Sequence, residues 1–419
     1  MSMQLVRTSS MRAGWCIPAT RQRFSPISRH TDTRFRKWHE QENEDMTDTV
    51  AIPDAATLTD AERDTLTGVG FDDMASRAAT AILTDAEVRL TQTNDSGVEI
   101  MPLKVALNTY EFVQDLMFGL VDADANEHIA MIAEHMHDPL GHFVWVRPGA
   151  KIRLPVQTFS LMETPQSRQF THDITLIDEG AEVEMISGAA APSEVHRGRH
   201  ISLSETYMRP GSRCRSVSIE HWGPGMEIHS YSHSRLERGV HENSTSIALS
   251  PIRHQVSQSR TVLEEDAVEV SQAICFAPEG TERLMRSETH LTGAGARSED
   301  LTRMVSAGGR IVNDSLLIGE AAGSQGFLGC DGLKLGQEGE ILAIPSLQAM
   351  AEGSQLSHEA SVGMIDDAKL NYLMAAGMEE DAARDLIVQG FLALDDAAVP
   401  DSLKARVAKM IAQAKSGGM

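Results

Sequence analysis

The sequence predicts a mainly β protein whose central part is a parallel β-helix, and three observations support this. First, residues 141–362 form a long series of short runs in which polar and apolar residues alternate, as in half-buried strands. Second, small glycine-containing turn units recur between these runs. Third, helical patterns are confined to the segments before and after this region. Weak repetition of strand and turn is typical of a solenoid in which each coil packs against the next.

The strand runs are short and are separated by regular turns. The clearest early runs are 143–146, 174–177, 182–186, 201–204 and 217–219. The turn units contain Glu-Gly, Pro-Gly, Ala-Gly or Gly-Gly pairs and stand at 179–180, 210–211, 224–225, 279–280, 294–295, 308–309, 322–323 and 338–339. Between 294 and 339 their intervals are about 14 to 16 residues, which we interpret as one coil with two or three short strands. On the residues alone, a β-sandwich is the structural alternative.

The segment before the β region predicts helices. From Asp60 to about Met136, apolar residues recur at spacings of three and four, after the capping residues Thr59-Asp60-Ala61-Glu62. We therefore expect an N-terminal helical region over 46–140. Residues 1–45 carry eight basic and five acidic side chains and receive no predicted fold. Such a composition is typical of an organelle transit peptide, but a translation start at Met46 is the interpretation we prefer.

Residues 364–419 predict three amphipathic helices that would follow the β region. Asp366 or Asp367 can cap the first helix, because an aspartate side chain accepts hydrogen bonds from free amides of the first turn. The breaks between and after the helices are predicted at Gly377, Gly390, Pro400 and Gly417-Gly418. Helices at the end of a solenoid can cap it or bind a partner.

Composition excludes several functional classes. The 419 residues include 60 acidic and 37 basic side chains, which give a formal net charge of −23. Binding to nucleic acid or to an anionic membrane needs clustered basic residues, so neither is expected. No apolar run approaches the roughly 18 residues of a membrane span. The four cysteines have no CxxC spacing, which argues against a zinc ribbon and a disulfide framework. A cytoplasmic protein is expected.

Cys330 and the pair His358-Glu359 are the candidates for chemistry. A lone cysteine in a β core is commonly a small hydrophobic residue, and adjacent strand residues point to opposite faces. At most one residue of the pair can therefore face Cys330. Together the three side chains offer a thiolate, an imidazole and a carboxylate, which suit the binding of iron and the holding of sulfur.

The other cysteines and histidines receive simpler interpretations. Cys214 and Cys275 are expected to be core or surface thiols, with an additional role in sulfur entry as the alternative. Four histidines crowd a helix end, where solvent exposure is favoured over metal binding because Pro139 and Gly141 break the spacing: His128, His135, His137 and His142. The histidines on later strands are expected at polar positions of the sheets: His196, His200, His221, His229, His233 and His241.

The segments GFLGCDGLKLG, AIPSL and LSHEASVGMIDDAKLNYLMAAGMEEDAARDLIVQGF resemble the SufB/SufD scaffold proteins of the SUF iron–sulfur cluster assembly system. The upstream segments HISLSE and HWGPG are also similar, so the resemblance covers residues 141–395. Glu205 and Trp222, which lie in these upstream segments, are expected to be packing residues. The family resemblance implies a right-handed parallel β-helix over 141–363 that dimerises near its C-terminal coils. It also implies that the helices of 364–419 dock an ABC-type ATPase of the SufC kind.

The resemblance assigns roles to residues. Cys330 matches the cysteine that carries sulfur, as a persulfide, and ligates the nascent cluster, and His358 and Glu359 match the further cluster ligands. The implied docking residues are Leu370, Tyr372, Leu373, Leu386, Ile387 and Phe391. The cluster is implied to be transient and destined for apo-proteins. ATP and magnesium belong to the partner, because this chain has no GxxxxGK[ST] loop. The chain is therefore expected to be a scaffold and not an enzyme, and a flavin requirement stays open.

One departure from the family pattern concerns sulfur entry. Better-known SufB proteins have a cysteine before Ala-Pro, where this chain has Ala189. Free sulfide or direct delivery to Cys330 thus becomes more plausible than a relay, and a homodimer or a SufB/SufD-type heterodimer are both open. A SufD-like structural half is the alternative function. A β-helix polysaccharide lyase or hydrolase is a more distant one, since no secretion signal is visible and the helical tail would be unexplained.

Overall fold

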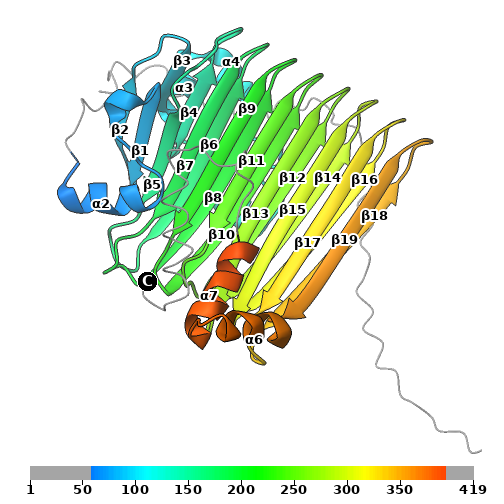
Figure 1. Ribbon diagram of the computed structural model, residues 1–419. Helices are drawn as coiled ribbons and strands as arrows, with labels where there is room; N and C mark the ends of the chain where they lie inside the picture. Colours follow the sequence, from blue (N-terminus) through cyan, green and yellow to red (C-terminus); the bar gives the residue numbers. More distant parts are fainter. Residues whose placement is uncertain (1–57, 393–419) are drawn as a thin grey trace, which may run out of the picture. The chain divides into compact units, whose positions relative to one another are not determined.

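The computed structural model describes residues 58–392, and most of them form a parallel β-solenoid of about eight turns (Figure 1). The chain alternates between two sheets, so that each turn contributes one strand to each. The ten-stranded sheet contains, in spatial order, β19 (Gln355–Met364), β17 (Gln325–Lys334), β15 (Arg297–Ala307), β13 (Val268–Pro278), β11 (His241–Ala248), β9 (Arg213–His221), β7 (Glu182–Ala190), β5 (Val156–Leu161), β1 (Ala79–Thr84) and β2 (Glu87–Thr93). The nine-stranded sheet contains β18 (Glu340–Ala349), β16 (Arg310–Gly319), β14 (Glu282–Leu291), β12 (His254–Leu263), β10 (Gly225–Leu236), β8 (Arg197–Met208), β6 (Arg168–Ile177), β4 (His142–Val146) and β3 (Val98–Pro102).

Successive coils pair in parallel and in register. Glu227, His254, Glu282 and Arg310 are paired in turn along the nine-stranded sheet, at separations of 27 or 28 residues. One coil therefore takes about 28 residues, and the interpretation of a 14 to 16 residue interval as a whole coil is wrong. That interval spans one strand and one bend, and a coil of two sheets needs two of each. Parallel pairing from β5 to β19 also excludes the antiparallel β-sandwich.

The predicted strands and turns are largely confirmed. All five early strand runs fall within β4, β6, β7, β8 and β9, which extend beyond them. Most of the predicted turn glycines adopt a positive φ, the conformation that a residue without Cβ adopts without strain: Gly180, Gly211, Gly280, Gly295, Gly308, Gly323 and Gly339. The predicted turn at 224–225 is different, since Gly225 is the first residue of β10.

The N-terminal part contains both helices and strands. Its helices are α2 (Asp60–Gly68), the 3-10 helix η1 (Met74–Ser76), α3 (Leu103–Thr109), α4 (Glu111–Leu116) and α5 (Glu127–Ala133). The predicted cap is confirmed, because the Thr59 side chain accepts from the Glu62 amide in a reciprocal capping box. Between α2 and α3, however, β1, β2 and β3 replace the expected helix. Five of the six residues of β1 are buried, and a strand buried on both faces has no alternating pattern that distinguishes it from a helix.

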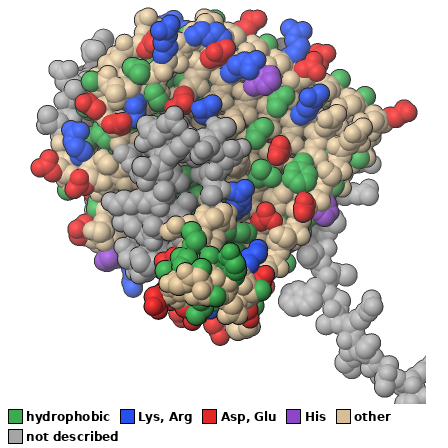
Figure 2. Space-filling view, viewed as in Figure 1, with side chains coloured by type: hydrophobic (Ala, Val, Ile, Leu, Met, Phe, Trp, Pro, Cys, Tyr) green, Lys and Arg blue, Asp and Glu red, His purple; other side chains and the backbone are tan. Residues whose placement is uncertain are grey.

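Two helices follow the last coil, as predicted: α6 (Asp367–Ala375) and α7 (Glu380–Phe391). Asp366 caps α6 by accepting from the Ala368 amide, and Gly377 has a φ of 97° just beyond its end. Figure 2 shows hydrophobic side chains gathered on the surface of this helical pair. The third predicted helix and residues 1–45 lie outside the described residues. None of the described helices is long and apolar enough to cross a membrane.

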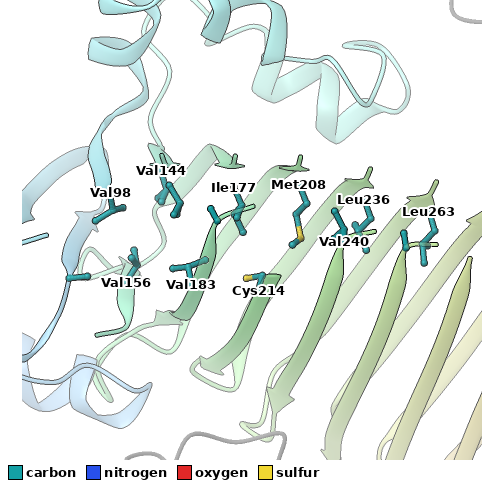
Figure 3. Close-up of a cluster of buried hydrophobic side chains, with 14 of the residues drawn as sticks. Val98, Val144, Val156, Ile177, Val183, Met208, Cys214, Leu236, Val240 and Leu263 are labelled. Atoms are coloured by element: carbon teal, nitrogen blue, oxygen red, sulfur yellow. The ribbon is translucent and has the colours of Figure 1, made fainter. Parts of the chain in front are cut away.

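The interior is filled by rows of aliphatic side chains that stack from coil to coil (Figure 3). One such row contains Val98, Val144, Val156, Ile177, Val183, Met208, Cys214, Leu236, Val240 and Leu263. Each fully buried aliphatic side chain contributes about 1.5–3 kcal/mol relative to its exposed state. Because each row continues through neighbouring coils, each coil is stabilised mainly by packing against the coils next to it.

Glu205 of β8 fastens the N-terminal helices to the solenoid. Its carboxylate is completely buried and accepts hydrogen bonds from the Phe118 and Leu120 amides, both at 2.7 Å. It also contacts His172 Nε2 at 2.8 Å, and this histidine is equally buried. The interpretation of Glu205 as a packing residue agrees with this geometry, although its role is electrostatic as well as steric.

Replacing Glu205 by alanine is expected to reduce the free energy of unfolding by about 3 kcal/mol, because two amides and a buried imidazole lose their acceptor. Urea unfolding followed by circular dichroism measures the loss. Glu264→Ala is the matched control, since Glu264 pairs with Arg235 at 2.6 Å on the surface and is expected to cost less than about 1 kcal/mol. Equal losses in the two variants would contradict the proposed anchoring role.

Candidate functional site

Cys330 lies near the C-terminal end of the solenoid, on the inner face of β17. Its side chain is only 2% exposed and packs in a small apolar cluster with Cys275, Ala277, Met304 and Ile311. The buried residues Leu328, Cys330 and Gly332 alternate along β17, so they share the face that points inward. The residues packed around Cys330 come from both sheets, as expected of an interior position. The thiol is therefore enclosed between the sheets.

The polar groups near Cys330 have opposite effects on the pKa of its thiol. The Asn313 side-chain amide of β16 donates a hydrogen bond to Cys330 Sγ at an N···S distance of 3.4 Å. Burial raises the pKa of the Cys330 thiol above its ordinary value, and the negative charge of Asp300 raises it further. The hydrogen bond from Asn313 lowers it, while Asp331 adds to the increase. Without a bound cation the enclosed thiol is held mainly in its neutral form.

His358 and Glu359 lie on β19, the strand that follows β17 in the sheet. His358 is paired with Leu328, and Cys330 is paired with Ala360, so the imidazole and the thiol share one face of neighbouring strands. Glu359 is paired with Gly329 and lies on the opposite face. Both His358 and Glu359 are exposed. Within residues 58–392, no three histidine, cysteine or carboxylate side chains converge in a way that could hold a metal ion.

The last coil is the open end of the solenoid (Figure 1). β19 and β18 are the terminal strands of the two sheets, so each has one edge without a strand partner among the described residues. Several large apolar side chains of these strands are exposed: Leu342, Ile344, Val362 and Met364. Free strand edges with exposed apolar residues are suited to pairing with another chain.

The six docking residues predicted on α6 and α7 divide into two groups. Leu370 is buried, Leu373 is partly buried, and Ile387 and Phe391 pack against the large cluster that contains Leu333. These four hold the helices in place. Tyr372 and Leu386 are 75% and 47% exposed and, like Met374, are exposed apolar residues of the pair.

Ala189 and the other described cysteines offer no second thiol at the surface. Ala189 lies in β7 and packs against the apolar cluster that contains Trp222, consistent with the packing role expected of that tryptophan. Cys214 and Cys275 are buried and free. Burial raises the pKa of Cys275 to about 11, and that of Cys214 is also well above its ordinary value. Both are core thiols, as expected.

Three histidines that appeared unrelated in the sequence meet at a cavity of about 470 Å³. The ring centroids of His128 and His229 are 3.9 Å apart, and those of His229 and His254 are 5.9 Å apart. Burial lowers the pKa of His229 to about 4. The expected exposure of the first histidine group holds for His135 and His137, whereas His128 is half-buried and His142 is buried. The sequence could not indicate this cluster, because α5, β10 and β12 each contribute one ring.

Comparison with known proteins identifies the family. A model described as SUF system FeS cluster assembly, SufBD core domain, matches residues 160–391, which is more than half of the chain. An iron–sulfur cluster assembly SufBD family protein of Archaeoglobus fulgidus is 29% identical over 355 residues, covering 84% of this chain and 95% of that protein. One of Methanothermobacter thermautotrophicus is 28% identical over 389 residues, covering 92% and 93%. SufB of Bacillus subtilis is 23% identical over 262 residues, covering 60% and 55%. The solenoid, its cysteine near the open end and these matches show that the chain belongs to the SufBD family of iron–sulfur cluster assembly proteins.

Proposed function

We propose that this chain is a SufB-like scaffold on which an iron–sulfur cluster is built from iron and sulfur and then passed to apo-proteins. The observation that carries the proposal is the position of Cys330 and His358 on one face of β17 and β19, at the open end of the solenoid. A thiolate and an imidazole are suitable ligands for iron, and a thiolate can also carry sulfane sulfur. Membership of the SufBD family supports a role in cluster assembly.

The proposal includes a second chain. Of the three proposed ligands, one chain places Cys330 and His358 on the inner face, which is fewer than the four ligands that a cluster takes in its usual sites. Pairing of two chains along β18 and β19 would bring two such sets together, with Glu359 as a further ligand from the outer face. The second chain is either another copy or a SufD-type protein, and the free strand edges suit both.

An ATPase partner is proposed for α6 and α7. Tyr372 and Leu386 give this pair an exposed apolar surface, while Ile387 and Phe391 attach it to the solenoid. A SufC-like ABC ATPase that binds there could transmit movement to β19, which directly precedes α6. ATP and magnesium are assigned to that partner, and no flavin site is assigned. The net charge of −23 and the free thiols suit the proposed cytoplasmic location.

A SufD-like structural half is the second candidate, and Ala189 favours it because the usual sulfur-entry thiol is missing. The two candidates differ in what Cys330 does. A structural half would form the dimer and bind the ATPase without using this thiol. A scaffold depends on it.

Cys330→Ser is expected to abolish loading of iron and sulfide while dimer formation and ATPase binding persist. Anaerobic reconstitution of the complex with iron and sulfide, followed by absorption and Mössbauer spectra, measures the loss. Cys275→Ser is the matched control, because Cys275 is equally buried in the same cluster but has no proposed ligand role. Full loading of Cys330→Ser would exclude Cys330 as the required ligand, whereas a native chain that loads neither iron nor sulfide would support the structural half.

Leu386→Ser is expected to weaken binding of the SufC-like ATPase by about tenfold or more, since it removes an exposed apolar side chain from the proposed surface. Isothermal titration calorimetry measures the dissociation constant. Leu154→Ser provides the control, because Leu154 has nearly the same exposure, 46% against 47%, but lies between β4 and β5. Equal affinity of the Leu386 variant and the native chain would move the docking surface elsewhere.

A further inference from the structure

Asn313 is a buried amide that reaches Cys330 from the opposite sheet. It lies in β16, is 3% exposed, and donates through Nδ2 to Cys330 Sγ at 3.4 Å. Cys330 lies in β17, in the other sheet, so this contact crosses the interior of the solenoid. The hydrogen bond thus connects Cys330 Sγ to the opposite sheet.

The surroundings make an amide expensive at this position unless it has a specific task. Its neighbour Ile311 in β16 and the side chains that form the Cys330 cluster are apolar, whereas Thr302 and Asp300 are polar residues of the same inner face. Burying an amide among apolar residues costs free energy that only a good hydrogen bond offsets. A neutral thiol is a weak acceptor, whereas hydrogen bonds to a charged acceptor are roughly twice as strong as neutral ones. The amide therefore suits a sulfur atom that carries negative charge better than it suits a neutral thiol.

Asp300 has the opposite effect to Asn313 on negative charge at the Cys330 sulfur. It lies in β15, next to β17, and is paired with Leu328 on the inner face. Thr302, two residues further along β15, is paired with Cys330. The Ser271 hydroxyl donates to its carboxylate at 2.8 Å, which fixes the group inside the solenoid. A carboxylate charge on the same inner face disfavours further negative charge on the sulfur, whereas the amide N–H favours it.

We infer that Asn313 is the positioning residue of Cys330: its amide holds Sγ and stabilises negative charge on that sulfur when it ligates iron, and Asp300 acts in the opposite sense. The inference rests on the proposed function, because it concerns the cluster that Cys330 is proposed to hold. Hydrogen bonds to ligating sulfur raise the reduction potential of a cluster, and nearby negative charge lowers it. The two residues should therefore shift that potential in opposite directions.

The hydrogen bond itself can be tested without any cluster. In the NMR spectrum of the full iron-free chain, the side-chain amide signals of Asn313 are identified by their loss in Asn313→Leu. Cys330→Ala is expected to shift these signals, because it removes the acceptor. Cys275→Ala is the control, since it creates a similar cavity in the same cluster but leaves the hydrogen bond intact. Signals that respond equally to both changes, or to neither, would overturn the positioning role.

The electrostatic part is tested on the chain loaded with iron and sulfide, by spectroelectrochemical titration. Asn313→Leu is expected to lower the reduction potential, and Asp300→Asn, which removes charge with little change in shape, to raise it. Asn313→Ala also lacks the donor, so it is expected to lower the reduction potential in the same way and replaces the leucine variant if that variant does not fold. Unchanged potentials, or shifts in the same direction for both positions, would overturn the inference while the native chain still loads a cluster. A native chain that binds no cluster would instead overturn the proposed function, and this inference with it.

Discussion

Parallel, in-register pairing of each coil with the next is the constraint on which the rest of this structure depends. Every strand between the first and the last coil has its backbone groups paired on both sides, so it offers nothing to another chain. At the beginning, β1 with β2 and β3 with β4 form antiparallel pairs that end the parallel stack. At the other end, β18 and β19 have a free edge among the described residues. Strands β2 and β3 at the first end also have one edge without a strand partner among the described residues, so the capacity for assembly lies at the two ends of the solenoid, and Cys330 is one strand away from the C-terminal one.

The same constraint separates the candidate ligands. Because the chain alternates its side chains and β19 keeps register with β17, His358 must share the face of Cys330 and Glu359 must take the other. No rotamer can move Glu359 through the strand to the inner face. A site that uses all three side chains is thus difficult to build in one chain. The division of ligands is a physical reason to expect a second chain, independent of the family resemblance.

Much of the fold could be predicted from local patterns, and the site only in part. Gly180, Gly211 and the later turn glycines marked the bends, because a positive φ leaves few other choices. The coil length could not be predicted, because a strand followed by a bend has the same sequence pattern in either sheet. The pattern therefore does not show that one coil contains two strands and two bends. Strand β1 was missed because burial on both faces removes alternation. Cys330 and His358 were visible as chemical types, whereas Asn313 was not, because its partner lies across the interior and no spacing connects the two.

The position of Cys330 also bears on how sulfur reaches it. Five strand spacings separate β7, which holds Ala189, from β17, a distance of about 24 Å along the sheet. Without a thiol at Ala189, a route from that point would have no acceptor at its start. The open end is one spacing away, but Cys330 is enclosed there by its apolar cluster. Access then requires the last coil to move, and β19 continues directly into α6, next to α7, which is anchored on the Leu333 cluster. In the scaffold proposed here, a force applied to the two helices would act on β19, the strand paired with the one that carries the thiol. Sulfur delivery and ATPase movement would thereby become parts of one step.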